Sequence, residues 1–388
     1  MLKRFPRSWT HLFTFVALLL LSLQLKAADM IPAPPQIGAT AYLVMDADTG
    51  EVLLAKNENE RFAPASLTKM MTSYIVEYEI ARGNIAEDDM VPVSEKAWRT
   101  PGSRMFIREG TQVRLGDLLR GVIIQSGNDA SVALAEYIAG GERAFADLMN
   151  QHASMLGLEN TQFRNATGLP DPEHYSSPHD LAMIGRALIR QFPEHYSIYS
   201  EKYFTYNEIR QPNRNRLLWR DDSVDGIKTG HTEEAGYCLV ASAKRDDMRL
   251  ITVVLGTSSE EARAQETQKL LSYAFRFYRT HKLYNAGQVL NQARVWGGAT
   301  NQVRLGLDEA LSVTIPRGQR DQLGANLDLN PVIKAPVARG QELGRVVVEL
   351  NGEEVKSVPL VALEAVPEGG LFKRIWDEIV LFFTSLFK

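Results

Sequence analysis

Strand patterns at both ends of a helical stretch constrain the fold of this chain more than any other feature. Alternating apolar residues mark two strands within residues 39–56, joined by a turn, and the same period returns over residues 224–257. Helical patterns fill the interval, and a further helix is predicted from residue 259 to about 280. The early hairpin must then pair with the late strands. We therefore predict an α+β domain in which helices flank one antiparallel sheet.

The N-terminal 28 residues are typical of an export signal. Three basic side chains precede an apolar run at residues 12–25, and two small residues follow it: Lys3, Arg4, Arg7, Ala27 and Ala28. An uncleaved membrane anchor is the alternative. Removal of this segment, which also holds Lys26, deletes four basic residues and no acidic one, so the formal charge falls from −4 to −8. No basic stripe remains, and we expect no nucleic-acid partner.

A second domain of different character is predicted after residue 282. Residues 29–282 form the first domain, whereas residues 283–366 alternate short strands with Gly, Pro and Asn turns, including a hairpin turn at Asn351-Gly352. This small all-β domain has no cluster of metal-ligating residues, so we expect it to be a spacer or a partner-binding domain. Cys238 is the only cysteine, which excludes an internal disulfide and predicts a buried, small apolar side chain.

The C-terminal segment, residues 367–388, is predicted to be an amphipathic helix. Its apolar residues fall on about half of the helical circumference: Leu371, Phe372, Ile375, Trp376, Ile379, Val380, Phe382, Phe383, Leu386 and Phe387. Charged residues interrupt it too often for a membrane span, so we expect it to lie in a membrane interface. Docking on the protein's own core is the alternative. The preceding Pro367-Glu368-Gly369-Gly370 indicates a hinge.

Ser66-Leu67-Thr68-Lys69 is the first candidate for chemistry. Pro64 prevents a helix from running through this point, so Ser66 should lie at a helix start with Lys69 on the same face. A hydroxyl beside an amine and a helix N-terminus can form an activated nucleophile. A helix cap followed by a surface lysine fits equally well, and the same pattern recurs at residues 385–388.

Two further short motifs occur once each. Ser126-Gly127-Asn128 connects two predicted helices, where Asn128 or Asp129 could simply cap the second. Lys228-Thr229-Gly230 lies on a predicted strand and is followed by His231. Ser-x-x-Lys, a Ser-x-Asn loop and Lys-Thr-Gly in this order, each in this setting, point to one active site.

Together with the β domain and the terminal helix, these motifs resemble the low-molecular-mass penicillin-binding proteins of the penicillin-binding protein 5 and 6 type. Gly127 stands where the superfamily motif usually has Asp. The resemblance implies a β-lactamase/transpeptidase-like first domain and a serine-type D-alanyl-D-alanine carboxypeptidase without metal or other cofactor. It further implies removal of the terminal D-alanine from peptidoglycan pentapeptides, acylation by β-lactam antibiotics, and a periplasmic enzyme held peripherally on the outer face of the inner membrane.

The resemblance also implies roles for individual residues. Ser66 would attack the carbonyl carbon, and Lys69 would be the base, which requires its pKa to fall from ~10.4 to roughly 7 through burial and the nearby Lys228. Ser126 would relay a proton to the leaving amine, and Asn128 would hold Lys69 and the substrate amide. The backbone N–H groups of Ser66 and His231 would form the oxyanion hole. The remaining substrate-binding residues would be Lys228, Thr229, Gly230, His231 and Arg263, the last of which could equally be a surface arginine.

Other activities of the same fold remain open at this stage. A β-lactamase of class A should carry Glu-x-x-Leu-Asn between Ser126 and Lys228, and residues 171–174 do not match it. A class C enzyme should carry Tyr-x-Asn in place of Ser126-Gly127-Asn128. A D,D-endopeptidase or transpeptidase would use identical chemistry, and a non-catalytic peptidoglycan-binding module would have no use for the complete set of motifs.

Overall fold

The computed structural model describes residues 31–386, so the predicted export signal lies outside the described residues. Its first sheet confirms the predicted pairing of the early hairpin with the late strands. The strand order is β2-β1-β9-β8-β7, and all neighbours are antiparallel. The bounds are β1 (Ala41–Asp46), β2 (Val52–Lys56), β7 (Val224–Thr232), β8 (Gly236–Arg245) and β9 (Met248–Thr257).

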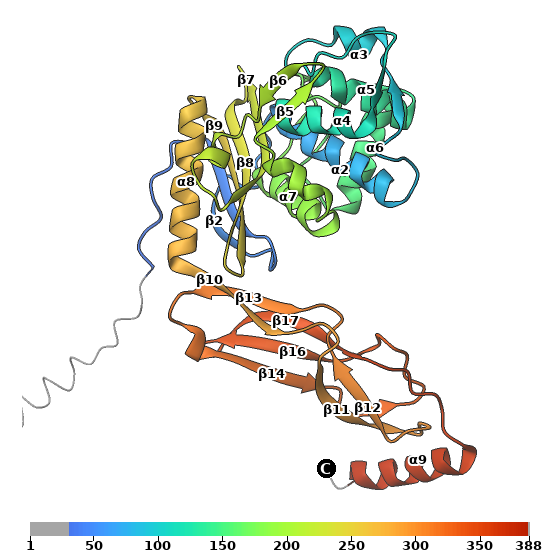
Figure 1. The fold of residues 1–388 in the computed structure, drawn as a ribbon. Helices are drawn as coiled ribbons and strands as arrows, with labels where there is room; N and C mark the ends of the chain where they lie inside the picture. The colour runs from blue at the N-terminus through green and yellow to red at the C-terminus, as the bar shows by residue number, and fades with distance from the viewer. Residues whose placement is uncertain (1–30, 387–388) are drawn as a thin grey trace, which may run out of the picture.

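Helices cover both faces of this sheet because its side chains alternate between two apolar cores. Leu43 of β1 packs with one group of helices, whereas its neighbour Val44 packs in a second core with α8 (Glu260–Phe277). Figure 1 shows α8 alone on one side and the other helices on the opposite side. Those helices are α2 (Lys69–Ala81), α3 (Glu95–Arg99), α4 (Leu115–Arg120), α5 (Asn128–Ala139), α6 (Glu142–Met155) and α7 (Pro178–Gln191).

Several local features differ from the predicted elements. The helix expected over residues 116–124 is divided into α4 and a π-helical turn, Gly121–Gln125, which ends at Ser126 with φ +66°. Two short hairpins were not predicted, because three or four residues give no readable period. They are formed by β3 (Met90–Pro92), β4 (Gln112–Arg114), β5 (Tyr203–Tyr206) and β6 (Ile209–Pro212). Single 3-10 turns occur at Ala65–Thr68, His195–Ser200, Arg216–Trp219 and Arg320–Gln322.

The C-terminal β domain begins earlier than its sequence pattern indicated. Helix α8 ends at Phe277, not near residue 280, and β10 (Tyr278–Tyr284) pairs with β13 (Leu311–Pro316) of the β domain. We therefore take Tyr278 as the start of this domain. Its six-stranded sheet has the order β14-β16-β17-β12-β11-β15. These strands are β11 (Val289–Trp296), β12 (Gln302–Gly306), β14 (Leu323–Leu329), β15 (Ile333–Lys334), β16 (Glu342–Leu350) and β17 (Glu353–Ala362).

The terminal helix α9 (Leu371–Leu386) lies beside the β domain (Figure 1). It contacts this domain through its polar side. Asp377 is buried and its Oδ2 accepts a hydrogen bond from the Gly297 N–H at 2.8 Å, while the Lys373 amine donates to the Gly298 carbonyl oxygen. The apolar side remains exposed, with Phe372 at 90% and Trp376 at 67% of full exposure. Docking of the apolar face on the core, the alternative to membrane contact, is therefore not what the structure shows.

The segment before α9 is held in place rather than free to act as a hinge, contrary to the sequence prediction. The Ala299 N–H donates to the Pro367 carbonyl oxygen and the Gly369 N–H donates to the Gly297 carbonyl oxygen, both at 2.8 Å. A Cβ on Gly369 would lie only 2.8 Å from the Gly298 oxygen, so this approach requires glycine. Among the described residues, no helix combines the length and apolarity that crossing a bilayer requires.

Candidate active site

Ser66 and Lys69 lie one turn apart where a 3-10 turn runs into α2, as the sequence predicted. The Lys69 amine donates to the Ser66 hydroxyl oxygen at 3.0 Å and to the Thr167 carbonyl oxygen at 2.5 Å. Ser66 is half-buried and Lys69 is completely buried. A helix cap followed by a surface lysine is therefore the wrong interpretation of this motif.

Burial and, to a lesser extent, the positive charge of Arg214 together lower the pKa of Lys69 to about 7, while Asp129 acts in the opposite direction. Lys228 was the cation expected from the sequence, whereas the cation that lowers the pKa of Lys69 is Arg214, which no motif marks. Lys228 is itself buried, and burial followed by the charge of Lys69 holds its pKa well below the ordinary value. At neutral pH a large share of Lys69 is uncharged and able to accept a proton.

A loop at residues 164–174, predicted only as a turn, packs against the segment that carries Ser66 and Lys69. The Asn165 side-chain oxygen accepts hydrogen bonds from the Thr167 and Gly168 N–H groups, which directs the Thr167 carbonyl to Lys69. Gly168 has φ +80°, and a Cβ there would lie 1.8 Å from the Ala65 carbonyl oxygen. Only glycine allows this approach. The turn residues were visible in the sequence, but their contact with Ala65 was not.

His174 anchors the same loop to the turn that carries Ser66. Its Nδ1 accepts a hydrogen bond from the Arg164 N–H at 3.1 Å, which assigns the proton to Nε2, and Nε2 then donates to the Thr68 hydroxyl at 2.8 Å. Burial lowers the pKa of His174 to about 4, so the ring is neutral at pH 7. No pattern in the sequence indicates this contact.

The Ser126-Gly127-Asn128 loop presents two polar atoms without protein partners. The Ser126 hydroxyl oxygen and the Asn128 side-chain oxygen are buried, and neither has a hydrogen-bond partner among the described residues. The Asn128 amide nitrogen donates to the Pro101 carbonyl oxygen at 2.6 Å, whereas the predicted contact with Lys69 is made by Thr167. Gly127 is the N-cap of α5 and Asn128 makes no cap bond, whereas the Asp129 carboxylate accepts from the Ala130 N–H in the first turn of this helix.

Strand β7 brings the third motif close to Ser66. It is the edge strand of the sheet, so every second N–H faces away from β8. A Cβ on Gly230 would lie 3.1 Å from the Pro64 carbonyl oxygen, which shows how closely this strand meets the Ser66 turn. Lys228 and Thr229 are buried, whereas His231 is exposed and stacks on Tyr237 with ring centroids 3.9 Å apart.

Arg263 supports this strand from α8. It is buried, with 5% of its surface exposed, which rules out the surface alternative. Its guanidinium donates to the Gly230 carbonyl oxygen at 3.2 Å. The described residues contain no group of three or more His, Cys, Asp or Glu side chains that could hold a metal ion.

Comparison with protein families then decides the class of this site. A family model described as D-alanyl-D-alanine carboxypeptidase matches residues 28–259, and one described as the C-terminal domain of penicillin-binding protein 5 matches residues 278–368. The chain belongs to the D-alanyl-D-alanine carboxypeptidase family. This confirms the resemblance, the fold class and the predicted activity, a serine-type D-Ala-D-Ala carboxypeptidase. The endopeptidase, transpeptidase and β-lactamase alternatives are not favoured.

Individual members of the carboxypeptidase family are similar over nearly the whole chain. D-alanyl-D-alanine carboxypeptidase DacC of Escherichia coli is 47% identical over 93% of this chain and 92% of its own. The crystal structure of penicillin-binding protein 5 from Haemophilus influenzae is 46% identical and superposes with a TM-score of 0.83, covering 87% of this chain and 99% of the other.

A third relative bears on ligands of the carboxypeptidase domain. Penicillin-binding protein D2 from Listeria monocytogenes is 29% identical, covers 63% of this chain and 99% of its own, and has a TM-score of 0.58. Its structure is known in an ampicillin-bound form.

Proposed function

We propose that Ser66 is the nucleophile of this carboxypeptidase and that Lys69 is its general base. The distance of 3.0 Å between the Lys69 amine and the Ser66 hydroxyl, at a lysine with a pKa of about 7, is the observation that carries the proposal. Lys69 takes the hydroxyl proton as Ser66 Oγ bonds to the carbonyl carbon of the penultimate D-alanine. The C–N bond then breaks, and water later hydrolyses the acyl-enzyme.

Ser126 and Asn128 are proposed to serve the leaving group and the substrate amide. Buried polar groups are nearly always hydrogen-bonded, so two buried oxygens without protein partners on one loop favour contact with a ligand. Ser126 would pass the proton to the departing D-alanine amine. The Asn128 side-chain oxygen would accept a hydrogen bond from the substrate peptide N–H, while its amide group remains tied to Pro101.

Recognition of the substrate's free carboxylate is assigned to β7. Lys228 and Thr229 would bind it, with Gly230 allowing the close approach, and the backbone N–H groups of Ser66 and His231 would stabilise the oxyanion. Arg263 was predicted to contact the carboxylate directly. The hydrogen bond from Arg263 to the Gly230 carbonyl oxygen instead favours a role for this arginine in positioning the edge strand.

The experiment that tests this assignment uses the mature full chain in detergent with a pentapeptide ending in D-Ala-D-Ala. Release of free D-alanine without a cross-linked dimer is expected, whereas dimer formation would favour transpeptidation. Ser66→Ala should abolish both D-alanine release and acylation by labelled penicillin. β-Lactams should acylate Ser66 and leave slowly, and turnover as fast as that of a dedicated β-lactamase would contradict the assignment.

The cellular setting is proposed from the two ends of the chain. The N-terminal sequence pattern favours export to the periplasm. The exposed apolar side of α9, including Phe372 and Trp376, supports peripheral binding to the outer face of the inner membrane. The polar contacts of Asp377 and Lys373 would keep this apolar side turned away from the β domain.

A further inference from the structure

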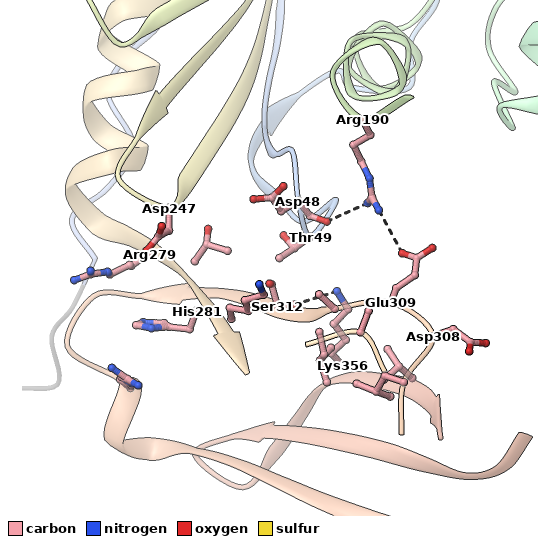
Figure 2. A pocket seen from close by; sticks show the side chains of 18 of the residues that line it. Asp48, Thr49, Arg190, Asp247, Arg279, His281, Asp308, Glu309, Ser312 and Lys356 are labelled. Carbon is pink, nitrogen blue, oxygen red and sulfur yellow. Dashed lines mark hydrogen bonds and ion pairs between the residues drawn. The ribbon is translucent and has the colours of Figure 1, made fainter. Parts of the chain in front are cut away.

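A pocket of about 1290 Å³ lies between the catalytic domain and the β domain. The β1–β2 turn, α7 and the β8–β9 turn line one side, and β10, β13 and β17 line the other (Figure 2). The β8–β9 turn is at the opposite end of β8 from His231 and the nucleophile. Since β8 has 10 residues and a strand rises ~3.3 Å per residue, the pocket is roughly 30 Å from the active site.

The charge of the pocket lining is predominantly positive. Seven lining residues are Arg or Lys and four are Asp or Glu. Of these acids, Glu309 is already bound to Arg190 at 3.3 Å. The cations are Arg186, Arg190, Arg279, Lys282, Arg317, Arg320 and Lys356.

Three of these arginines gather around His281 at one side of the pocket. Burial lowers the pKa of His281, and Arg320, Arg279 and Arg317 lower it further, with no acidic residue acting in the opposite direction. Within residues 31–386, none of the three arginines forms an ion pair with a carboxylate. Figure 2 shows Arg279 and His281 on the same side of the pocket. Asp247 lies beside Arg279 there, so the cations outnumber the acids on this side of the pocket but are not free of them.

A second group of cations forms the wall nearer to α7. Arg186 donates to the backbone carbonyl oxygens of Ala47 and Asp48, at 2.7 and 3.0 Å, and the Lys356 amine donates to the Ser312 carbonyl oxygen at 3.2 Å. Neutral carbonyl partners hold these side chains in place but leave their charge available. Burial lowers the pKa of the half-buried Lys356, and Arg186 and Arg190 lower it further, while Glu51 and Asp46 act in the opposite direction.

We propose that this pocket binds a carboxylate-bearing segment of the cell-wall polymer, namely a second peptide side chain on the glycan whose neighbouring peptide occupies the active site. The proposal rests on the proposed function. Guanidinium groups bind carboxylates through paired hydrogen bonds. The volume exceeds the ~300–1,000 Å³ of most small-molecule sites, which favours a polymer segment over a small ion.

The position of the pocket also argues for the polymer over a lipid headgroup. Figure 1 shows α9 at the end of the β domain that is farthest from the catalytic domain. With α9 on the membrane, the pocket is separated from the lipid surface by the length of the β domain, about 30 Å along the nine residues of β16. Phosphate groups of lipids would therefore not reach it.

The test compares two pairs of substitutions of equal charge. Arg279→Gln/Arg320→Gln removes two exposed arginines of the pocket, and Arg143→Gln/Arg339→Gln removes two exposed arginines elsewhere. Binding is measured with the full chain carrying Ser66→Ala, so that peptides are not cleaved. The probes are a glycan fragment carrying two pentapeptides, a single pentapeptide, inorganic phosphate, and phosphatidylglycerol vesicles.

The pocket pair should raise the Kd for the two-peptide fragment about tenfold and leave the Kd for the single pentapeptide unchanged. The control pair should change neither, and added salt should weaken the pocket contribution. Three outcomes would overturn the proposal. The first is an equal loss of affinity for the two-peptide fragment in both pairs of substitutions, and the second is an unchanged Kd for that fragment in the pocket pair. The third is a pocket pair that loses only the binding of phosphate or of vesicles. Failure of the chain with Ser66 intact to release D-alanine from the single pentapeptide would overturn the proposed function instead.

Discussion

The Lys69 amine lies 2.5 Å from the Thr167 carbonyl oxygen, so the candidate base is held by a loop that follows it by almost a hundred residues. Through Lys69, the geometry of this loop is coupled to the Ser66 hydroxyl 3.0 Å away.

Acylation should depend on pH through Lys69. The burial that lowers its pKa to about 7 means that the neutral, proton-accepting form is lost as pH falls below that value. We expect the acylation rate to fall about tenfold per pH unit below 7 and to level off above it. Stopped-flow acylation by a fluorescent penicillin between pH 5 and 9 measures this. A flat profile would exclude Lys69 as the titrating base, and Lys69→Arg should reduce the rate by at least about 10² at every pH.

Ser126→Ala separates a catalytic role from a structural one. The hydroxyl oxygen has no protein hydrogen bond to lose, so the free energy of unfolding should change by less than about 0.5 kcal/mol. The rate of D-alanine release should fall by about 10²–10⁴ if Ser126 passes the proton. Urea unfolding and steady-state kinetics on the same preparation give both values. A large stability loss with a proportionate loss of activity would indicate a structural role.

Gly168→Ala should damage the fold through a specific contact, and Gly157→Ala is its matched control. Both glycines have positive φ, at +80° and +71°, so each substitution costs about 1–2 kcal/mol in backbone strain. Only at Gly168 does the new Cβ meet the Ala65 carbonyl, because Gly157 faces open space. We expect Gly168→Ala to lose at least about 2 kcal/mol more in urea unfolding and to acylate poorly. Equal effects of the two substitutions would show that the close approach is unimportant.

The protein should lose stability in mild acid through His174. Its pKa falls from 6.5 to about 4 on folding, so the unfolded chain binds the extra proton first as pH decreases. The free energy of unfolding should therefore rise with pH between about 4 and 6.5, by up to about 3 kcal/mol from this residue. Urea titrations at pH 4.5 and 6.5 should show a smaller difference in His174→Gln than in the parent. The same difference in both proteins would assign the effect to other groups.

Membrane binding should depend on the exposed side of α9. Phe372→Ser/Trp376→Ser removes two exposed aromatic side chains and should weaken binding to phospholipid vesicles by at least about tenfold, with D-alanine release unchanged. Val355→Ser, at an exposed apolar residue of β17, is the control and should bind normally. Truncation before Gly369 should give the same result as the double variant. Loss of activity with unchanged vesicle partition would contradict the anchoring role.

The sheet and the three motifs were predictable because they depend on local patterns. Period-two runs such as those of β8 and β9 determine the strands, and few antiparallel arrangements can join them. The Ser66 turn was predictable from Pro64 and the apolar run that follows.

The rest of the site depends on contacts between distant residues, which periodicity does not report. Nothing local indicates that Thr167 accepts from Lys69, that Arg214 lowers the pKa of Lys69, or that Gly168 packs against Ala65. The prediction of a hinge before α9 was wrong for the same reason. Glycine is needed at residue 369 because a side chain there would meet the Gly298 carbonyl oxygen, and not because the backbone must move.

Cys238 lies buried near the start of β8, the strand next to the edge strand β7, and burial raises the pKa of its thiol to about 11. Less than about one molecule in a thousand then carries the reactive thiolate at neutral pH. With no second cysteine in the chain, the fold needs no oxidant or disulfide isomerase to mature. Folding of this protein is thus independent of the redox state of the compartment in which it occurs.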